Sequence, residues 1–216
     1  MISGLQILAV VPARGGSKGI PRKNLSKIGD KTLIQLVGEV VAAVHEIDYA
    51  VVSTDDDEIG TEALRWGLDY PFKRPAELSS DLVGDMPVLR HAVTESELAQ
   101  QKEFDLVVLL QPTSPVRYPT EIAMCLHRAV EAEAEAVWTV SETDLKFHPW
   151  KQLDLSSEGL LSFWNDEGRE IIARQELKSS YTRNGVAYVY RRSAVLENFS
   201  GMPNKTLGIP LTGDRV

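Results

Sequence analysis

Short apolar runs alternate with amphipathic segments along the first part of the chain. Residues 5–11 (LQILAVV) are apolar at odd and even positions alike, which is typical of a strand buried on both faces of a parallel sheet. Residues 31–47 place their apolar side chains at helical spacing, and residues 49–54 (YAVVST) return to a strand pattern. This order predicts βαβ units and a mostly parallel sheet.

The alternation continues through residue 141. A polar run at 54–57 precedes a helical segment at 58–67 that Gly67 is placed to end. Residues 104–110 read as a third strand, Pro119 opens a helix over 119–134, and residues 134–141 read as a fourth strand. These elements extend the predicted α/β sheet.

The alternation of strand and helix patterns stops between residues 142 and 180, where neither a helical nor a strand period is sustained. We expect an excursion of short irregular elements there, with a small antiparallel arm. Residues 185–199 then restore a strand and a short helix, and 205–211 read as a last strand. The chain is therefore predicted to form one domain over 1–216, with helices on both faces of a mostly parallel sheet and an arm at about 142–180.

Composition and charge narrow the class of protein. A formal net charge of −8 argues against a general nucleic-acid binder, and no apolar stretch approaches the roughly 20 residues of a membrane span. The start lacks a basic leader before its apolar run, and one cysteine cannot form an internal disulfide. We expect a cytoplasmic protein without a membrane partner.

Against this acidic background, residues 12–24 (PARGGSKGIPRKN) are strongly basic and follow directly after the first strand. Arg14 offers a planar fork of donors and Lys18 a compact charge, while Gly15 and Gly16 let the backbone approach a ligand closely. The loop matches neither of the common phosphate-binding fingerprints, so a solvated basic turn is the alternative. Its place at the carboxyl end of a buried strand favours a phosphate site.

Five segments in order carry a resemblance to a known family: residues 10–25 (VVPARGGSKGIPRKNL), 51–59 (VVSTDDDEI), 71–81 (PFKRPAELSSD), 107–117 (VVLLQPTSPVR) and 183–190 (RNGVAYVY). Together they resemble the acylneuraminate cytidylyltransferase family, which comprises CMP-sialic acid synthetases and relatives acting on other nine-carbon sugar acids. The resemblance implies a Rossmann-like nucleotidyltransferase fold and a homodimer built through the arm. It also implies transfer of CMP from CTP to the sugar's anomeric hydroxyl, with Mg²⁺ and release of pyrophosphate.

The resemblance assigns a nucleotide half of the site. Arg14 and Lys18 match the family's phosphate-loop cations and are the expected catalytic residues, because they would stabilise charge on the leaving pyrophosphate. The other expected nucleotide-binding residues are Gly15, Gly16, Ser17, Asn24, Arg74 and Asp81. Local alternatives exist for three of them: a turn cap for Asn24, a surface arginine in a rigid Arg-Pro turn for Arg74, and a cap of the helix containing residues 86–93 for Asp81.

The same resemblance assigns a sugar half. The expected substrate-binding residues are Gln111, Lys151, Arg174 and Asn184, with Lys151 and Arg174 able to come from the partner subunit. Ordinary surface charge is the alternative for these two cations. Arg117 is expected to be structural, pairing with an acid such as Glu121, and Gly185 to serve backbone geometry.

The metal ligands stay unassigned. Three consecutive carboxylates, Asp55 to Asp57, fit a capped helix start better than an ion site, and the four histidines lack metal-ligand spacing. The family's acidic D-I-D motif, whose carboxylates hold magnesium, is not reached before the sequence ends at IPLTGDRV, and Asp214 is a poorly anchored substitute. Two alternatives therefore remain: a non-catalytic nucleotide or sugar-nucleotide binding domain, and a cytidylyltransferase for an eight-carbon sugar acid.

Overall fold

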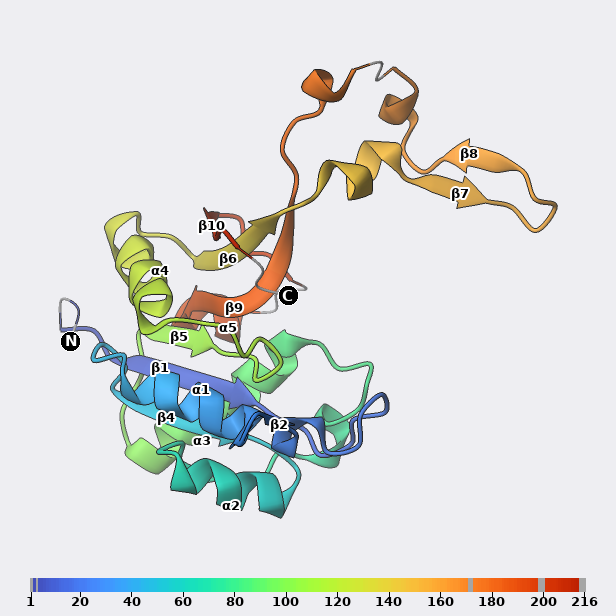
Figure 1. Ribbon diagram of the computed structural model, residues 1–216. Helices are drawn as coiled ribbons and strands as arrows, with labels where there is room; N and C mark the ends of the chain where they lie inside the picture. The colour runs from blue at the N-terminus through green and yellow to red at the C-terminus, as the bar shows by residue number, and fades with distance from the viewer. Residues whose placement is uncertain (1, 3, 171–172, 198–200, 214–216) are drawn as a thin grey trace.

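A six-stranded sheet forms the centre of the molecule (Figure 1). The computed structural model describes residues 2, 4–170, 173–197 and 201–213. In spatial order the strands are β10 (Thr206–Pro210), β6 (Ala136–Glu142), β9 (Tyr181–Arg191), β5 (Leu106–Leu109), β1 (Ile7–Pro12) and β4 (Tyr49–Ser53). Within this sheet β9 runs antiparallel to both neighbours, and the other strand pairs are parallel. The predicted mostly parallel α/β fold is confirmed.

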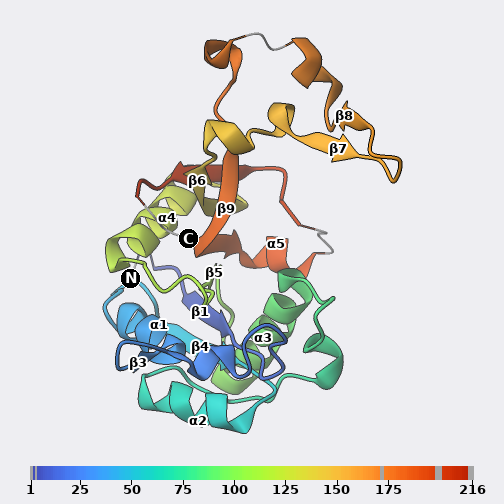
Figure 2. The same ribbon diagram turned by 45° about the vertical axis from the view of Figure 1, so that its right-hand side comes forward.

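Helices cover both faces of the sheet (Figure 2). One face carries α1 (Leu33–Ala42), α2 (Asp57–Arg65) and α4 (Pro119–Glu131), and the other carries α3 (Asp85–Gln100) and α5 (Arg192–Leu196). Strand β1 shows why its sequence is apolar at every position. From residue 7 to residue 11 its odd-numbered side chains pack into the first layer and its even-numbered ones into the second, so these five are buried from water.

The start and stop signals of α2 act as predicted. The Asp56 side chain accepts hydrogen bonds from the backbone N–H groups of Glu58 (2.9 Å) and Ile59 (3.3 Å), and Gly67, beyond the end, has φ +76°. Helix α1 is shorter than predicted, because it ends at Ala42 rather than near residue 47. Tight i→i+3 bonds close its last turn and lead the chain toward β4, which the apolar spacing alone did not reveal.

Shorter elements complete the chain. A two-stranded ribbon joins β2 (Lys27–Ile28) to β3 (Lys31–Thr32) ahead of α1. The 3₁₀ helices are Lys23–Leu25, Ala76–Leu78, Leu145–Phe147, Pro149–Lys151, Asp166–Glu170 and Arg174–Glu176. Across the part of the chain that the structure describes, no helix has both the length and the apolar character needed to cross a bilayer.

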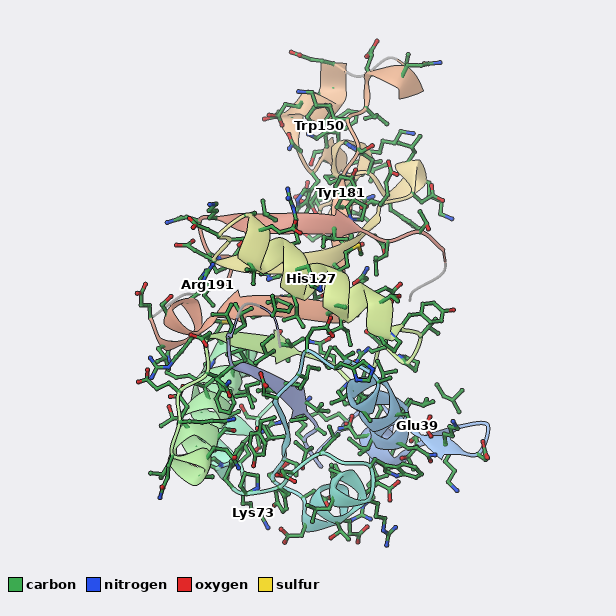
Figure 3. The ribbon with its side chains drawn as sticks, turned by 90° about the vertical axis from the view of Figure 1, so that its left-hand side faces the viewer. Glu39, Lys73, His127, Trp150, Tyr181 and Arg191 are labelled. Atoms are coloured by element: carbon green, nitrogen blue, oxygen red, sulfur yellow. The ribbon has the colours of Figure 1, made fainter. Side chains whose placement is uncertain are left out.

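The predicted antiparallel arm is present. Strands β7 (Leu153–Leu155) and β8 (Leu161–Phe163) pair as a hairpin that stands away from the six-stranded sheet (Figure 1). Trp150 lies within this arm, and Tyr181 lies where the chain returns to the sheet (Figure 3). The arm's role in dimerisation stays a prediction.

Candidate functional site

The largest grouping of predicted site residues lines one cleft of about 240 Å³. Three segments build it: the basic loop after β1, residues 74–88, and the loop after β5. They meet because the carboxyl ends of neighbouring parallel strands lie at the same edge of a sheet. The predicted site residues that line the cleft are Arg14, Ser17, Asn24, Arg74, Asp81 and Gln111.

The basic loop is fixed to the body at two points. The Asn24 side-chain amide donates to the carbonyl oxygen of Arg14 (3.0 Å), and the Gly15 N–H donates to Asp55 Oδ1 (2.9 Å). A Cβ atom on Gly15 would lie 2.8 Å from Asp56 Cβ, so a larger residue would push the loop away from α2. The Asn24 amide therefore holds the loop that carries Arg14 instead of capping a turn, and its contact with a nucleotide stays a prediction.

Arg14 and Lys18 converge on a single carboxylate. Arg14 Nη2 pairs with Asp81 Oδ1, and Lys18 Nζ lies 2.6 Å from Asp81 Oδ2. The Lys18 hydrogen bond and the charge of Arg14 hold the pKa of Asp81 below its usual range. The cap interpretation of Asp81 is wrong, since α3 follows Gly84 without a side-chain cap. The two cations of the basic loop therefore share one anionic partner, the Asp81 carboxylate.

Arg74 is a buried cation, not the surface arginine of the local alternative. It is 5% exposed, its Nε donates to Ser53 Oγ at 3.0 Å, and its Nη2 donates to the Ser53 carbonyl oxygen. Burial lowers the pKa of Arg74 to about 10, with a smaller opposing effect from Asp55. Its place in the cleft wall beside Arg14 gives the cleft a second, rigid positive group.

The loop after β5 is braced from behind by Arg117. This residue is buried, and its Nη2 donates to the carbonyl oxygens of Gln111 (2.5 Å) and Gly185 (3.1 Å). Its expected structural role is confirmed. Glu121 stabilises the Arg117 charge, but the hydrogen bonds go to carbonyl groups instead. Gly185 has φ +73°, and a Cβ there would lie 2.3 Å from Ser114 Oγ, which confirms the expectation of backbone geometry.

Asn184 lies behind the cleft rather than in its wall. Its side-chain oxygen accepts from Thr139 Oγ1 (2.7 Å), its amide donates to Ser141 Oγ (3.3 Å), and its carbonyl accepts from Ser114 Oγ (2.9 Å). These bonds tie β6 and β9 to the loop after β5. A contact between Asn184 and substrate stays a prediction, since the structure uses this side chain internally.

The two predicted sugar-side cations belong to the arm. Lys151 is exposed at the end of the short helix Pro149–Lys151 and does not line the cleft. Arg174 begins the short helix Arg174–Glu176 of the same arm. Within one chain, the cleft therefore gathers five of the predicted nucleotide-side residues together with Gln111 of the sugar side, whereas Lys18 and Lys151 do not line it.

Two further side chains, Cys125 and His148, do not line the cleft. Burial raises the pKa of the Cys125 thiol to about 12, which leaves it a poor nucleophile. His148, which lies within the arm, is buried and bonds through Nε2 to the Lys178 carbonyl oxygen at 2.9 Å. Among the described residues no group of three His, Cys, Asp or Glu side chains is arranged to hold a metal ion.

Several cleft residues were not singled out from the sequence as site residues. The polar ones among them are Lys23, Ser80, Asp85 and Thr113. Lys23 belongs to the basic loop, so its charge was a usable signal. Asp85 looks like an ordinary acidic residue at a helix start, and only the fold brings this first residue of α3 against β9, where Arg183 Nη2 lies 3.1 Å from its Oδ2.

Comparison with known proteins gives the site a context. The sequence matches the family described as "Cytidylyltransferase" over residues 8–198. It is 34% identical over 212 residues to CMP-N,N'-diacetyllegionaminic acid synthase of Legionella pneumophila, covering 94% of this chain and 86% of that protein. It is 29% identical over 190 residues to pseudaminic acid cytidylyltransferase of Campylobacter jejuni, covering 88% of this chain and 80% of that protein.

A similar fold occurs among solved structures. The structure of CMP:2-keto-3-deoxy-manno-octonic acid synthetase complexed with CTP matches with a TM-score of 0.68 at 20% identity, covering 98% of this chain and 92% of that chain. A 4-diphosphocytidyl-2C-methyl-D-erythritol synthase from Anaerococcus prevotii matches with a TM-score of 0.64 at 14% identity. At these identities the likeness shows the fold alone.

Proposed function

The chain belongs to the cytidylyltransferase family and is a nucleotidyltransferase, and from this premise we propose that it transfers CMP from CTP to a nine-carbon sugar acid of the sialic type. In the reaction, the sugar's anomeric oxygen forms a bond to the α-phosphorus of CTP. The bond from that phosphorus to the bridging oxygen breaks, and pyrophosphate leaves. The relatives' names are those of synthases and cytidylyltransferases, so a catalytic role is favoured over the binding-only alternative.

The convergence of Arg14 and Lys18 on Asp81 is the observation that carries the proposal. Two cations held by one carboxylate form an anion site whose present occupant is a side chain. The phosphates of CTP carry more charge and more acceptor oxygens than Asp81, so they are suited to replace it. Arg14 and Lys18 would then stabilise the charge that moves onto pyrophosphate as the bond breaks.

The other cleft residues would position the two reactants. Arg74, fixed by Ser53, contributes a rigid donor for the nucleotide, and the Gln111 amide offers a donor and an acceptor to a polyhydroxylated sugar. Holding both reactants in line supplies much of the acceleration in reactions of this kind. The residue that accepts the sugar's proton is not assigned.

Magnesium enters the proposal with the phosphates of CTP. The described carboxylates of the cleft, Asp81 and Asp85, already pair with Arg14, Lys18 and Arg183, so these residues do not fit a resident ion. Mg²⁺ favours phosphate oxygens and retains several waters, so it requires few protein ligands. Asp214, the substitute considered from the sequence, lies outside the described residues.

A homodimer built through the arm is the second part of the proposal. The arm exposes large apolar side chains that a monomer would leave in water: Phe147, Leu153, Leu155, Leu160, Leu161, Phe163 and Trp164. An apolar group of this kind is typical of a surface that another chain covers. The arm of one protomer would then present Lys151 and Arg174 to the sugar beside its partner's cleft, in a cytoplasmic enzyme.

A substrate panel tests the proposed function. Pyrophosphate release would be measured with CTP, Mg²⁺ and either a nine-carbon or an eight-carbon sugar acid, with ATP, GTP and UTP as nucleotide controls. We expect release with CTP and a nine-carbon acid. Release with the eight-carbon acid alone would reassign the acceptor, and no release with any acceptor would contradict the proposal.

A further inference from the structure

A second cavity lies directly beside the cleft. Its volume is about 340 Å³, and it shares Gly84 and Asp85 with the cleft. Its remaining walls include Met86, Pro87, Arg183 and Tyr190. A molecule in this cavity would therefore lie next to a nucleotide in the cleft, separated from it only by the start of α3.

Arg183 is held in a fixed orientation at this cavity. Its Nη2 lies 3.1 Å from Asp85 Oδ2, and its guanidinium carbon lies 4.7 Å from the Trp138 ring centroid and 4.5 Å from that of Tyr188. Stacking on two rings fixes the plane of the guanidinium group, and the ion pair fixes its rotation. The side chain is still 45% exposed, so it is accessible to a ligand.

The pairing with Asp85 decides which chemical group fits. Arg183 is already neutralised, and a ligand carboxylate beside it would meet the like charge of Asp85 a few ångströms away. A neutral group that both accepts and donates avoids this repulsion. An amide is such a group, because its carbonyl oxygen can accept from the remaining N–H groups of Arg183 and its N–H can donate to Asp85.

The rest of the cavity favours an amide that carries an apolar tail. Met86, Pro87 and the ring of Tyr190 form an apolar wall around the ion pair. Burial of an alkyl group against such a wall is favourable, because it removes apolar surface from water. A carbonyl, an N–H and a short alkyl group together constitute an acylamino substituent.

We propose that the Asp85–Arg183 pair recognises an acylamino substituent on the acceptor sugar and thereby determines which sugar acids the enzyme uses. This inference rests on the proposed function, because it concerns the acceptor of that reaction. Arg183 and Asp85 are specificity-determining residues in this assignment and take no part in the bond changes at phosphorus.

Two acceptors that differ at one substituent provide the test. N-acetylneuraminic acid carries an acetamido group at a carbon where its deaminated analogue carries a hydroxyl group. Pyrophosphate release with CTP and Mg²⁺ gives kcat/KM for each acceptor. For the unaltered protein we expect a preference of about tenfold or more for the acetamido acceptor, because the hydroxyl analogue leaves the pair partly unmatched.

Substitutions then show whether the Asp85–Arg183 pair causes the preference for the acetamido acceptor. We expect Arg183→Gln and Asp85→Asn each to bring the ratio of the two kcat/KM values close to one, mainly through a higher KM for the acetamido acceptor. The KM for CTP stays unchanged in Arg183→Gln, because Arg183 does not line the nucleotide cleft. Arg65→Gln, which removes an arginine paired with Glu62 on the surface of α2, is the matched control and keeps the full preference. Arg183→Lys provides a milder change if circular dichroism shows that Arg183→Gln does not fold.

The outcomes separate the two proposals. Turnover of neither acceptor by the unaltered protein would overturn the proposed function, and this inference with it. Turnover of both acceptors, with a preference that the folded variants retain, would overturn the inference alone. An equal rise in KM for both acceptors in Arg183→Gln would also overturn it, because Arg183 would then bind the carboxylate that the two share.

Discussion

The cleft and the arm differ in how far their side chains are paired or covered. In the cleft, charged side chains from distant parts of the sequence are paired or buried, as with Arg14 on Asp81 and Arg74 on Ser53. In the arm, Leu155, Leu161 and neighbouring apolar side chains are exposed around an isolated hairpin. The cleft pairs its charges within one chain, whereas the arm leaves an apolar surface uncovered. Under the proposed function, the nucleotide would bind in the body and the arm of a partner chain would complete the sugar half of the site.

Removing Lys18 gives the largest expected effect on the nucleotide half. We expect Lys18→Ala to lower kcat by about 10²–10³-fold, equivalent to roughly 3–4 kcal/mol, because a charge-stabilising group at the leaving pyrophosphate is lost. The melting temperature stays close to that of the unaltered protein, since the side chain is 86% exposed. Steady-state kinetics and thermal unfolding measure the two effects.

Lys73→Ala is the matched control, because Lys73 is an exposed lysine paired with Asp57 on α2, and it is expected to keep full activity. Unchanged turnover in Lys18→Ala would remove Lys18 from the catalytic residues.

A charged residue introduced into the arm tests whether the arm forms a dimer and completes the sugar site. Leu155 lies opposite Leu161 in the β7–β8 hairpin and is 64% exposed. We expect Leu155→Asp to dissociate the dimer and to raise the KM for the sugar acid about 30-fold, because charge-assisted bonds from the partner's arm are lost. Affinity for CTP is unchanged. Light scattering, kinetics and calorimetry report the three quantities.

Leu64→Asp places the same charge on α2, where Leu64 is 56% exposed, and it is expected to leave mass and KM unchanged. A protein that is monomeric before any substitution, with full activity toward the sugar, would contradict the division of the site between two chains.

A substitution at Gly15, where the basic loop lies close to α2, is expected to have a smaller effect on CTP binding. Gly15→Ala brings a Cβ within 2.8 Å of Asp56, so the loop must move. We expect CTP to bind about tenfold more weakly by calorimetry, because small displacements of positioned groups are costly. Gly19→Ala, whose Cβ would meet nothing within 4 Å, is the control. Equal affinities in the two variants would show that the loop position does not govern CTP binding.

Neutralising Asp81 is expected to have the smallest effect, and it should strengthen ligand binding where the other substitutions weaken binding or turnover. In Asp81→Asn, Arg14 and Lys18 no longer have a carboxylate that competes with phosphate. We expect pyrophosphate to bind about threefold more tightly, in keeping with a partly exposed ion pair. Because the pKa of Asp81 is lowered, the carboxylate is charged at and above its usual pKa, and the difference from Asp81→Asn persists between about pH 5 and 8. Weaker pyrophosphate binding in Asp81→Asn would mean that Asp81 assists phosphate binding instead.

The sequence predicted those features that depend on neighbouring residues. The apolar run of β1, the Asp56 cap, the positive φ of Gly67 and the irregular arm all follow from local pattern, and the structure has each of them. The family resemblance added the site residues, of which six line the cleft. The antiparallel direction of β9 was not predicted, because a buried strand has the same composition in either direction.

Pairings between distant segments could not be predicted in the same way. Asp81 was expected near the nucleotide, but its contact with both Arg14 and Lys18 depends on how two loops meet in space. The pair of Asp85 and Arg183 joins residues 98 apart, and neither has a local signal of function. Arg74 lay in an Arg-Pro turn typical of a surface, and only the end of β4 explains its burial.

A crystal structure of the protein with CTP bound would test the central claim most directly. The account predicts that the phosphates replace Asp81, so that Arg14 and Lys18 contact phosphate oxygens and the Asp81 carboxylate has moved away. A nucleotide bound elsewhere, with both cations still on Asp81 or turned to solvent, would contradict it.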